Sequence, residues 1–235
     1  MLEISGLVKR YGDITAVDHL SLRCHHEIYG LIGANGAGKS TTLKAVAGIL
    51  DFDEGDIRID GLSIRTQPLR CKQQMAYIPD NPDLYEMMRG QEYLNFVADV
   101  YQMDTAQRRR QIQRLATLFE MEGALGQRIG GYSHGMKQKL ALISALMHDP
   151  QLLILDEPFV GLDPKASFTL KQLMRELCER GHTIFFSTHV LEVAQKLCDR
   201  IAILMKGRIV AQGTMEEVIG QQSLEQVFLE LADHE

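Results

Sequence analysis

The sequence has 235 residues, of which 45% are hydrophobic and 24% charged, and its formal net charge is −6. This length is enough for one large domain with a hydrophobic core. The acidic balance argues against a protein that binds nucleic acid mainly through phosphate contacts, so we expect no nucleic-acid partner. The four cysteines have no metal-ligand spacing and indicate reduced thiols. No signal peptide and no apolar run of about 18 residues is visible, so any membrane role requires a partner.

The predicted elements alternate between strands and helices around a helical insert. Loose alternation over the first thirty residues predicts an antiparallel β layer. A compact apolar strand at 28–33 precedes a helix over 38–48, and 55–61 is a strand ending in an Asp-Gly turn. The later elements are predicted as helices at 92–101, 108–121 and 136–147, a strand at 151–158, a helix at 170–181, a strand at 182–189, a helix at 190–199 and a hairpin at 200–213.

Two S/T-x-x-E/Q capping boxes, Thr214 with Glu217 and Ser223 with Gln226, predict helix starts near the end of the chain. The whole pattern predicts an α/β fold with a P-loop core, an antiparallel β layer and a helical subdomain at about 86–148. Because the connections are short, we expect residues 1–235 to form a single domain.

A phosphate-binding loop is the strongest signal, because GANGAGKST matches G-x-x-x-x-G-K-[ST] between a strand and a helix. Its glycines let the backbone turn tightly and direct amide N–H groups at phosphates. Lys39 adds a positive charge, Ser40 offers a hydroxyl to Mg²⁺, and Thr41 supports the α-phosphate side. The predicted ATP-binding residues of this loop are Gly33, Ala34, Asn35, Gly36, Ala37, Gly38, Lys39, Ser40 and Thr41.

Polar residues also follow two later apolar strands. Asp156 and Glu157 come directly after four apolar residues, and His189 ends the strand at 182–189. The ends of parallel strands are where such sheets present ligands. We expect Asp156 to hold Mg²⁺ through water, Glu157 to act as the general base on the attacking water, and His189 to reach the γ-phosphate.

With the segments between them, these motifs make the chain resemble an ATP-binding cassette (ABC) transporter ATPase along nearly its whole length. The resemblance implies the ABC ATPase fold, ATP hydrolysis, and ATP with Mg²⁺ as cofactors. The matching segments are Tyr11 for adenine stacking, Gly33–Thr41 as Walker A, Leu152–Glu157 as Walker B, Gly161–Asp163 as the D-loop, His189 as the switch histidine, and Tyr132–Gln138 as the signature.

The signature and the Q-loop depart from the usual family pattern. Ser133 and Gly135 match the signature, whereas His134 replaces a glycine and Met136 replaces a glutamine. Asp80 stands where the Q-loop usually has glutamine, and a carboxylate cannot donate hydrogen bonds as an amide does. Both variants are similar to those of bacterial exporter ATPases.

The family resemblance also implies partners. A signature segment completes the ATP site of the opposite cassette, so a second cassette is expected; a homodimer is the simplest arrangement and a heterodimer stays open. Residues 80–89 would meet a multi-span membrane permease, which places the chain in the cytoplasm, peripherally on the cytoplasmic face of the cell membrane.

Two alternatives compete with a transporter subunit. A soluble regulatory ABC ATPase without a permease would have the same motifs. Gly131–Gly135 also fits the G-x-S-x-G motif of serine hydrolases, with Ser133, Asp163 and His189 in the order of a catalytic triad. That motif requires a strand directly before the serine, and the polar, glycine-rich residues before Ser133 predict none.

Overall fold

A computed structural model describes residues 1–233 of the chain. The described chain forms two compact units. The first unit contains residues 1–77, 151–158 and those from 174 onward, and the second contains residues 78–150 and 159–173. The second unit includes the helical insert expected at 86–148. No helix among residues 1–233 is long and apolar enough to cross a membrane.

One antiparallel sheet of the first unit has the strand order β2-β1-β4-β5. Its strands are β1 (Leu2–Tyr11), β2 (Ile14–Cys24), β4 (Glu54–Ile59) and β5 (Leu62–Ser63). This sheet is the antiparallel layer that the alternating residues predicted. The Asp60–Gly61 turn between β4 and β5 has positive φ at both residues, 47° and 78°, as a type I′ hairpin requires.

A second sheet has the strand order β10-β9-β3-β8-β7-β6. Its strands are β3 (Ile28–Ile32), β6 (Met75–Ile78), β7 (Leu152–Asp156), β8 (Thr183–Thr188), β9 (Arg200–Met205) and β10 (Arg208–Thr214). Strands β9, β3, β8 and β7 run parallel, and β10 pairs with β9 antiparallel. Every residue of β3, β7 and β8 is buried, which explains their continuous apolar sequences.

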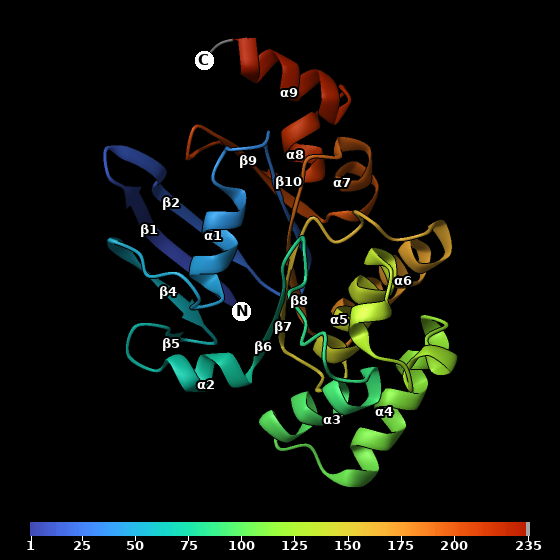
Figure 1. Ribbon diagram of the computed structural model, residues 1–235. Helices are drawn as coiled ribbons and strands as arrows, with labels where there is room; N and C mark the ends of the chain where they lie inside the picture. The colour runs from blue at the N-terminus through green and yellow to red at the C-terminus, as the bar shows by residue number, and fades with distance from the viewer. Residues whose placement is uncertain (234–235) are drawn as a thin grey trace. The chain divides into compact units, whose positions relative to one another are not determined.

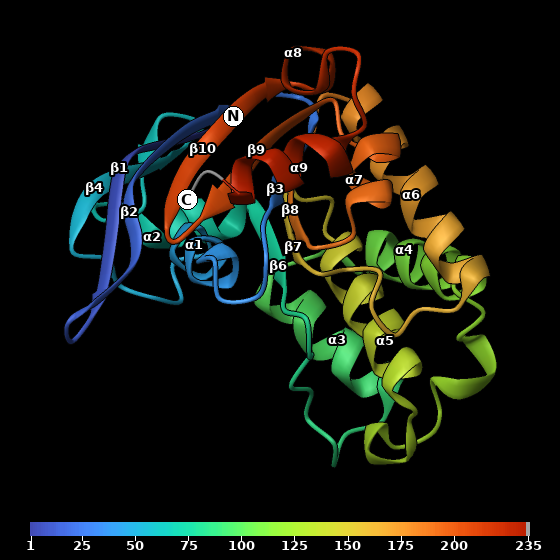
Figure 2. The ribbon, with the colours of Figure 1, turned by 90° about the horizontal axis from the view of Figure 1, so that it is seen from above.

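Helix α1 (Lys39–Val46) packs between the two sheets (Figures 1 and 2). Its buried Leu43 and Val46 join one core with Ile4 of the antiparallel sheet and with Ile154 and Phe185 of the parallel strands. The same unit contains four shorter or later helices: α2 (Pro68–Gln73), α7 (Leu191–Leu197), α8 (Met215–Ile219) and α9 (Leu224–Asp233). Both predicted capping boxes are confirmed at the starts of α8 and α9.

The second unit is helical. It contains α3 (Gly90–Val100), α4 (Thr105–Leu118), the short 3₁₀ turns η1 (Glu122–Ala124) and η2 (Ile129–Gly131), and α5 (His134–Leu146); α6 (Pro164–Glu179) begins in this unit. The helix starts differ from the predicted ones because polar caps extend α4 and α5, and a proline begins α6. Asp104 caps α4 three residues earlier than predicted, Ser133 caps α5 two residues earlier, and Pro164 starts α6 six residues earlier.

Comparing Gly55 with Gly61 distinguishes the effect of backbone strain from that of steric overlap. Both have positive φ, but a Cβ at Gly55 would lie 2.5 Å from the Gly6 carbonyl oxygen, whereas one at Gly61 would meet nothing within 4 Å. Gly61→Ala should therefore lower the free energy of unfolding by about 1 kcal/mol. Gly55→Ala should lower it by about 2 to 5 kcal/mol, because overpacking adds to the strain. Urea unfolding of both variants checks this, and equal losses would contradict it.

Candidate nucleotide-binding site

Two glycines of the phosphate loop lie against neighbouring backbone, whereas a Cβ at Gly36 would meet nothing within 4 Å. The loop at 33–38 connects β3 to α1. A Cβ at Gly33 would lie 2.5 Å from the Leu204 carbonyl oxygen, and one at Gly38 would lie 2.4 Å from that of Ala16. Gly38 also has a φ of 106°. Backbone from other segments of the chain therefore packs against the loop and restricts its conformation.

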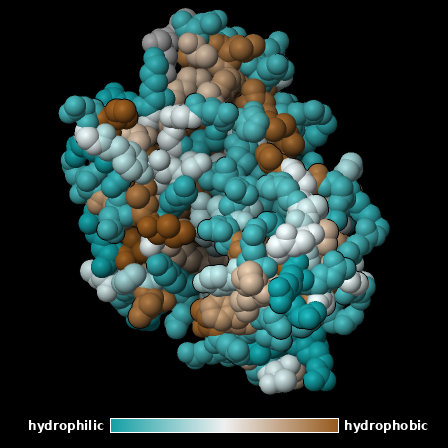
Figure 3. All heavy atoms as spheres, viewed as in Figure 1, coloured by the Kyte–Doolittle hydropathy of each residue, from teal (hydrophilic) through white to brown (hydrophobic). Residues whose placement is uncertain are grey.

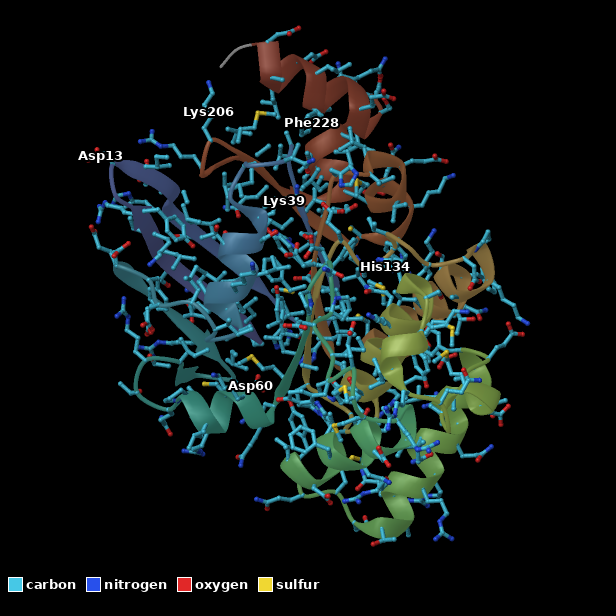
Figure 4. All side chains as sticks on the ribbon, viewed as in Figure 1. Asp13, Lys39, Asp60, His134, Lys206 and Phe228 are labelled. Carbon is cyan, nitrogen blue, oxygen red and sulfur yellow. The ribbon has the colours of Figure 1, made fainter. Side chains whose placement is uncertain are left out.

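Lys39 is held inside this loop. Lys39 is the first residue of α1 and is labelled in Figure 4; its side chain is only 6% exposed. Its Nζ donates to the carbonyl oxygens of Gly33 at 2.7 Å and Ala34 at 3.1 Å. The same nitrogen lies 3.5 Å from Glu157 Oε1. The structure thus brings the predicted lysine of Walker A and the predicted general base together.

The carboxylate pair lies at the end of β7, as predicted. Asp156 is 1% exposed, and its Oδ1 accepts a hydrogen bond of 2.5 Å from Ser187 Oγ. Its Oδ2 is buried and has no hydrogen-bond partner among residues 1–233. A buried carboxylate oxygen without a partner fits a hard cation or its water, because oxygen ligands suit Mg²⁺. No group of three or more His, Cys, Asp or Glu in the described chain could hold a metal alone.

Glu157 has an unusual backbone conformation, with a φ of 47°. Its amide N–H faces the carbonyl oxygen and the Oγ of Ser187, at 3.3 and 3.1 Å. The side chain is 13% exposed, and its buried Oε1 lies 3.0 Å from His189 Nδ1. The His189 amide N–H donates to Glu157 Oε2 at 3.3 Å. The predicted base and the predicted switch histidine are therefore direct neighbours.

Ser187 is a residue that sequence reasoning missed. It anchors both carboxylate residues from the neighbouring strand β8. The only sequence signal is its place at the end of an apolar run, two residues before His189. Pairing of β7 with β8 sets Asp156 opposite Ser187, which no local pattern reveals.

The signature segment lies in the helical unit, at the start of α5. Ser133 caps this helix by accepting a hydrogen bond from the Met136 amide at 3.3 Å. The ring of His134, labelled in Figure 4, packs on Gly161: a Cβ there would lie 2.3 Å from His134 Cδ2. A Cβ on Gly135 would lie 2.9 Å from the Gly161 carbonyl oxygen. The signature segment therefore packs tightly against the loop expected to be the D-loop.

An ion pair reinforces this packing. Lys139 Nζ lies 2.6 Å from Asp163 Oδ2, and this contact, with the Ala166 amide, holds the pKa of Asp163 below its usual value. The sequence did not identify Gly161 and Lys139 as partners of the signature. For Lys139, the available signal is its spacing of four residues from Gly135, which places both residues on one face of α5.

Other predicted site residues have local partners only. Tyr11 is half exposed at the end of β1, and Lys9 Nζ lies 5.2 Å above its ring. Asp80 is exposed, and its Oδ1 accepts a hydrogen bond of 2.8 Å from the Asn81 amide. Ser40 is exposed and Thr41 half buried at the start of α1. No hydrogen bond or ion pair among residues 1–233 joins the Tyr11 side chain to the phosphate loop.

The structure does not support the serine hydrolase alternative. The turn η2, not a strand, comes directly before Tyr132 and Ser133, so the strained strand-to-helix turn of a nucleophile elbow is missing. Ser133 is engaged as a helix cap. Asp163 pairs with Lys139, and His189 pairs with Glu157.

Comparisons with known proteins agree on one family. The family model for ABC transporters matches residues 17–160. An uncharacterised ABC transporter ATP-binding protein of Nostoc sp. is 38% identical over 202 residues, which is 84% of this chain and 59% of that protein. Nod factor export ATP-binding protein I of Burkholderia orbicola is 35% identical over 219 residues, which is 93% of this chain and 72% of that protein.

A solved structure of the ATP-binding subunit of an ABC transporter is 36% identical and has a TM-score of 0.94, with 99% of each chain covered. This likeness confirms the predicted α/β fold with its antiparallel layer and helical subdomain. The match to the family model extends over more than half of the sequence. The chain therefore belongs to the ABC transporter family, as an ATP-binding subunit that hydrolyses ATP.

Proposed function

We propose that this chain powers a membrane exporter by working as a dimer, in which each ATP lies between the phosphate loop of one cassette and the signature of the other. The observation that carries the proposal is the way the motifs are divided. The phosphate loop, Asp156 and Glu157 belong to one compact unit, and Ser133 with Gly135 belongs to the other. Each chain thus contributes one half of each of two ATP sites.

In the proposed hydrolysis step, Glu157 acts as the general base. Its Oε1 lacks a well-aligned hydrogen bond, so its lone pairs are available to accept a proton from the attacking water. Lys39 Nζ lies 3.5 Å from that oxygen and places positive charge at the phosphates. His189 orients the carboxylate and reaches the γ-phosphate. Ser40 and Asp156 would hold Mg²⁺, which neutralises phosphate charge when bound.

Tyr11 would stack on adenine, while the loop residues Ala34, Asn35 and Ala37 would contribute backbone amides to the phosphates. In the partner's site, Ser133 and the amides at His134, Gly135 and Met136 would donate to the γ-phosphate from the positive end of α5. Asp163 would act in the D-loop. Asp80 would contact Mg²⁺ or its waters, as a carboxylate accepts hydrogen bonds but does not donate them.

The segment at 80–89 supports a permease contact. The surface shown in Figure 3 is mostly hydrophilic, with hydrophobic residues in separate patches. Tyr85 is 60% exposed and Met87 79% exposed. The Tyr85 ring meets the rings of Tyr93 and Phe96 edge-on, with centroids 6.3 and 5.7 Å apart. Exposed aromatic and methionine side chains are typical of protein interfaces.

Export as the direction of transport rests on two supports. The signature and Q-loop variants resemble those of exporter ATPases, and one relative is named for export.

A soluble regulatory ATPase without a permease is the second candidate. The chain would lie in the cytoplasm on the cytoplasmic face of the membrane under the first proposal only. The proposal of a single domain over residues 1–235 stays a prediction.

Glu157→Gln tests the general base. The amide keeps the size of the side chain but cannot take the proton, so ATP turnover should fall by about 10²-fold or more while ATP still binds. Phosphate release and equilibrium nucleotide binding are the measurements. Glu192→Gln, an exposed change on α7, is the matched control and should keep wild-type turnover. A Glu157→Gln protein that hydrolyses ATP at the wild-type rate would overturn the assignment.

Ser133→Ala tests the signature in the dimeric site. Ser133 and Ser223 both cap helices, so replacing either by alanine should cost about 1 kcal/mol of stability. Only Ser133→Ala should impair turnover, and it should impair turnover more than nucleotide affinity. Steady-state kinetics and thermal unfolding of the two variants separate these effects. Equal turnover in the two variants, or equal activity of monomeric and dimeric fractions, would refute the sandwich arrangement.

Tyr85→Arg tests the permease surface. A charged side chain in the aromatic cluster should abolish co-purification of a multi-span membrane protein from solubilised native membranes, with ATP binding unchanged. Phe168→Arg is the control, because Phe168 is comparably exposed, at 62%, and lies outside the cluster. If the wild-type chain retains no membrane protein, the soluble regulatory alternative replaces the transporter proposal.

A further inference from the structure

A groove of about 750 Å³ lies within the helical unit, between α3, α4 and the segment after α4. Helices α3 and α4 lie side by side (Figure 1). The volume is in the range of sites for small molecules. The residues that α4 contributes recur every three or four positions and so share one face: Thr105, Arg108, Arg109, Ile112, Gln113 and Ala116.

The groove combines an apolar floor with polar walls. Ile112, Ala116 and Leu125 are at most 8% exposed, so they form the floor. Gln91 and Asn95 line the wall on α3, and the Gln91 Nε2 is 3.5 Å from Asn95 Oδ1. A hydrogen bond of this length is weak. Both amides therefore keep donors and acceptors available for another molecule.

Positive charge in the groove is only partly paired. Arg108 uses one terminal nitrogen on Asp99, but its Nε is buried and has no hydrogen-bond partner among residues 1–233. The exposed Arg109 has no ion pair in the same part of the chain. The acidic residue of the lining, Glu122, already accepts hydrogen bonds of 2.7 Å from Gln113 and Thr117. Unused N–H donors of arginine thus outnumber unused carboxylate oxygens.

We propose that this groove binds a small molecule that carries a carboxylate or a phosphate on an apolar or aromatic body. The planar fork of an arginine matches two oxygens of such an anion, and both Arg108 and Arg109 line the groove. The apolar floor accepts the body of the molecule. The site is independent of the proposed transport function, since it involves no residue of the nucleotide site.

The groove is also distinct from the aromatic cluster on α3. Gln91 and Asn95 are four residues apart and share one flank of the helix, whereas Tyr93 and Phe96, three residues apart, share the other. A permease that covers Tyr85 and its neighbours therefore contacts the flank of α3 opposite to the groove.

The direct test is a titration of the full chain, saturated with ADP so that the nucleotide site is filled. Phenyl phosphate and benzoate are the probes, and benzyl alcohol is the neutral control. With ¹⁵N-labelled arginine, the Nε–Hε signal of Arg108 should shift and saturate with at least one anionic probe, and it should not respond to benzyl alcohol. The probe that binds more tightly distinguishes phosphate from carboxylate. No saturation with either probe would overturn the proposal.

Substitutions on α4 provide matched controls. Arg108→Gln should weaken binding of the better probe by about tenfold or more, and Arg108→Lys should also weaken it because it loses the fork. Arg110→Gln changes the same charge at an exposed position outside the groove and should stay within about twofold of wild type. A folded Arg108→Gln protein that binds normally, or an equal loss in Arg110→Gln, would refute the site. If thermal unfolding shows that Arg108→Gln does not fold, the exposed Arg109→Gln takes its place against Arg110→Gln.

Discussion

The register of three buried parallel strands is the constraint on which the catalytic half-site depends. Pairing of β3 with β8 sets Leu31 opposite Ser187, and pairing of β8 with β7 sets Ser187 opposite Asp156. Leu31, Ser187 and Asp156 thus form one row across the sheet. The phosphate loop follows β3 and Glu157 follows β7, so both lie beside the end of this row. Because side chains alternate along a strand, a slip of one residue in the pairing of β8 with β7 would turn Ser187 away from Asp156. Burial of both faces makes such a slip costly.

The same row explains why the chain tolerates strain at Glu157. A non-glycine residue with positive φ costs about 1–2 kcal/mol, and such residues cluster at functional sites. Here the Ser187 carbonyl oxygen and hydroxyl both face the strained amide, which offsets part of the cost. The strained turn places the Glu157 carboxylate within 3.5 Å of Lys39 Nζ and 3.0 Å of His189 Nδ1.

Much of this half-site could be predicted from the sequence, because its signals are local. The phosphate loop has a fixed spacing between strand and helix, and the carboxylates and His189 follow apolar strands. The α/β fold and both capping boxes could be predicted for the same reason. Strand β6 and helix α2 were not predicted, since their four and six residues are too short to show a period.

Contacts between distant segments could not be predicted. The close approach of Leu204 to Gly33, the Ser187 anchor and the packing of His134 on Gly161 join residues at least 27 positions apart. No spacing rule connects such positions in one sequence. The groove beside α4 has a similar origin: Arg108 and Arg109 lie on the helix predicted at 108–121, and only the fold brings Gln91 and Leu125 to the same space. Tyr11 and Asp80 keep roles that rest on family resemblance.

The contact between His134 and Gly161 limits how this sequence can change. A side chain at 161 would collide with the imidazole ring, so the two positions are not free to vary one at a time. Trimming residue 134 to glycine first would open the space, although the left-handed backbone at 161 would still disfavour most side chains. A side chain at position 161 is therefore limited both by the ring of His134 and by the local backbone, and replacing His134 removes only the first limit.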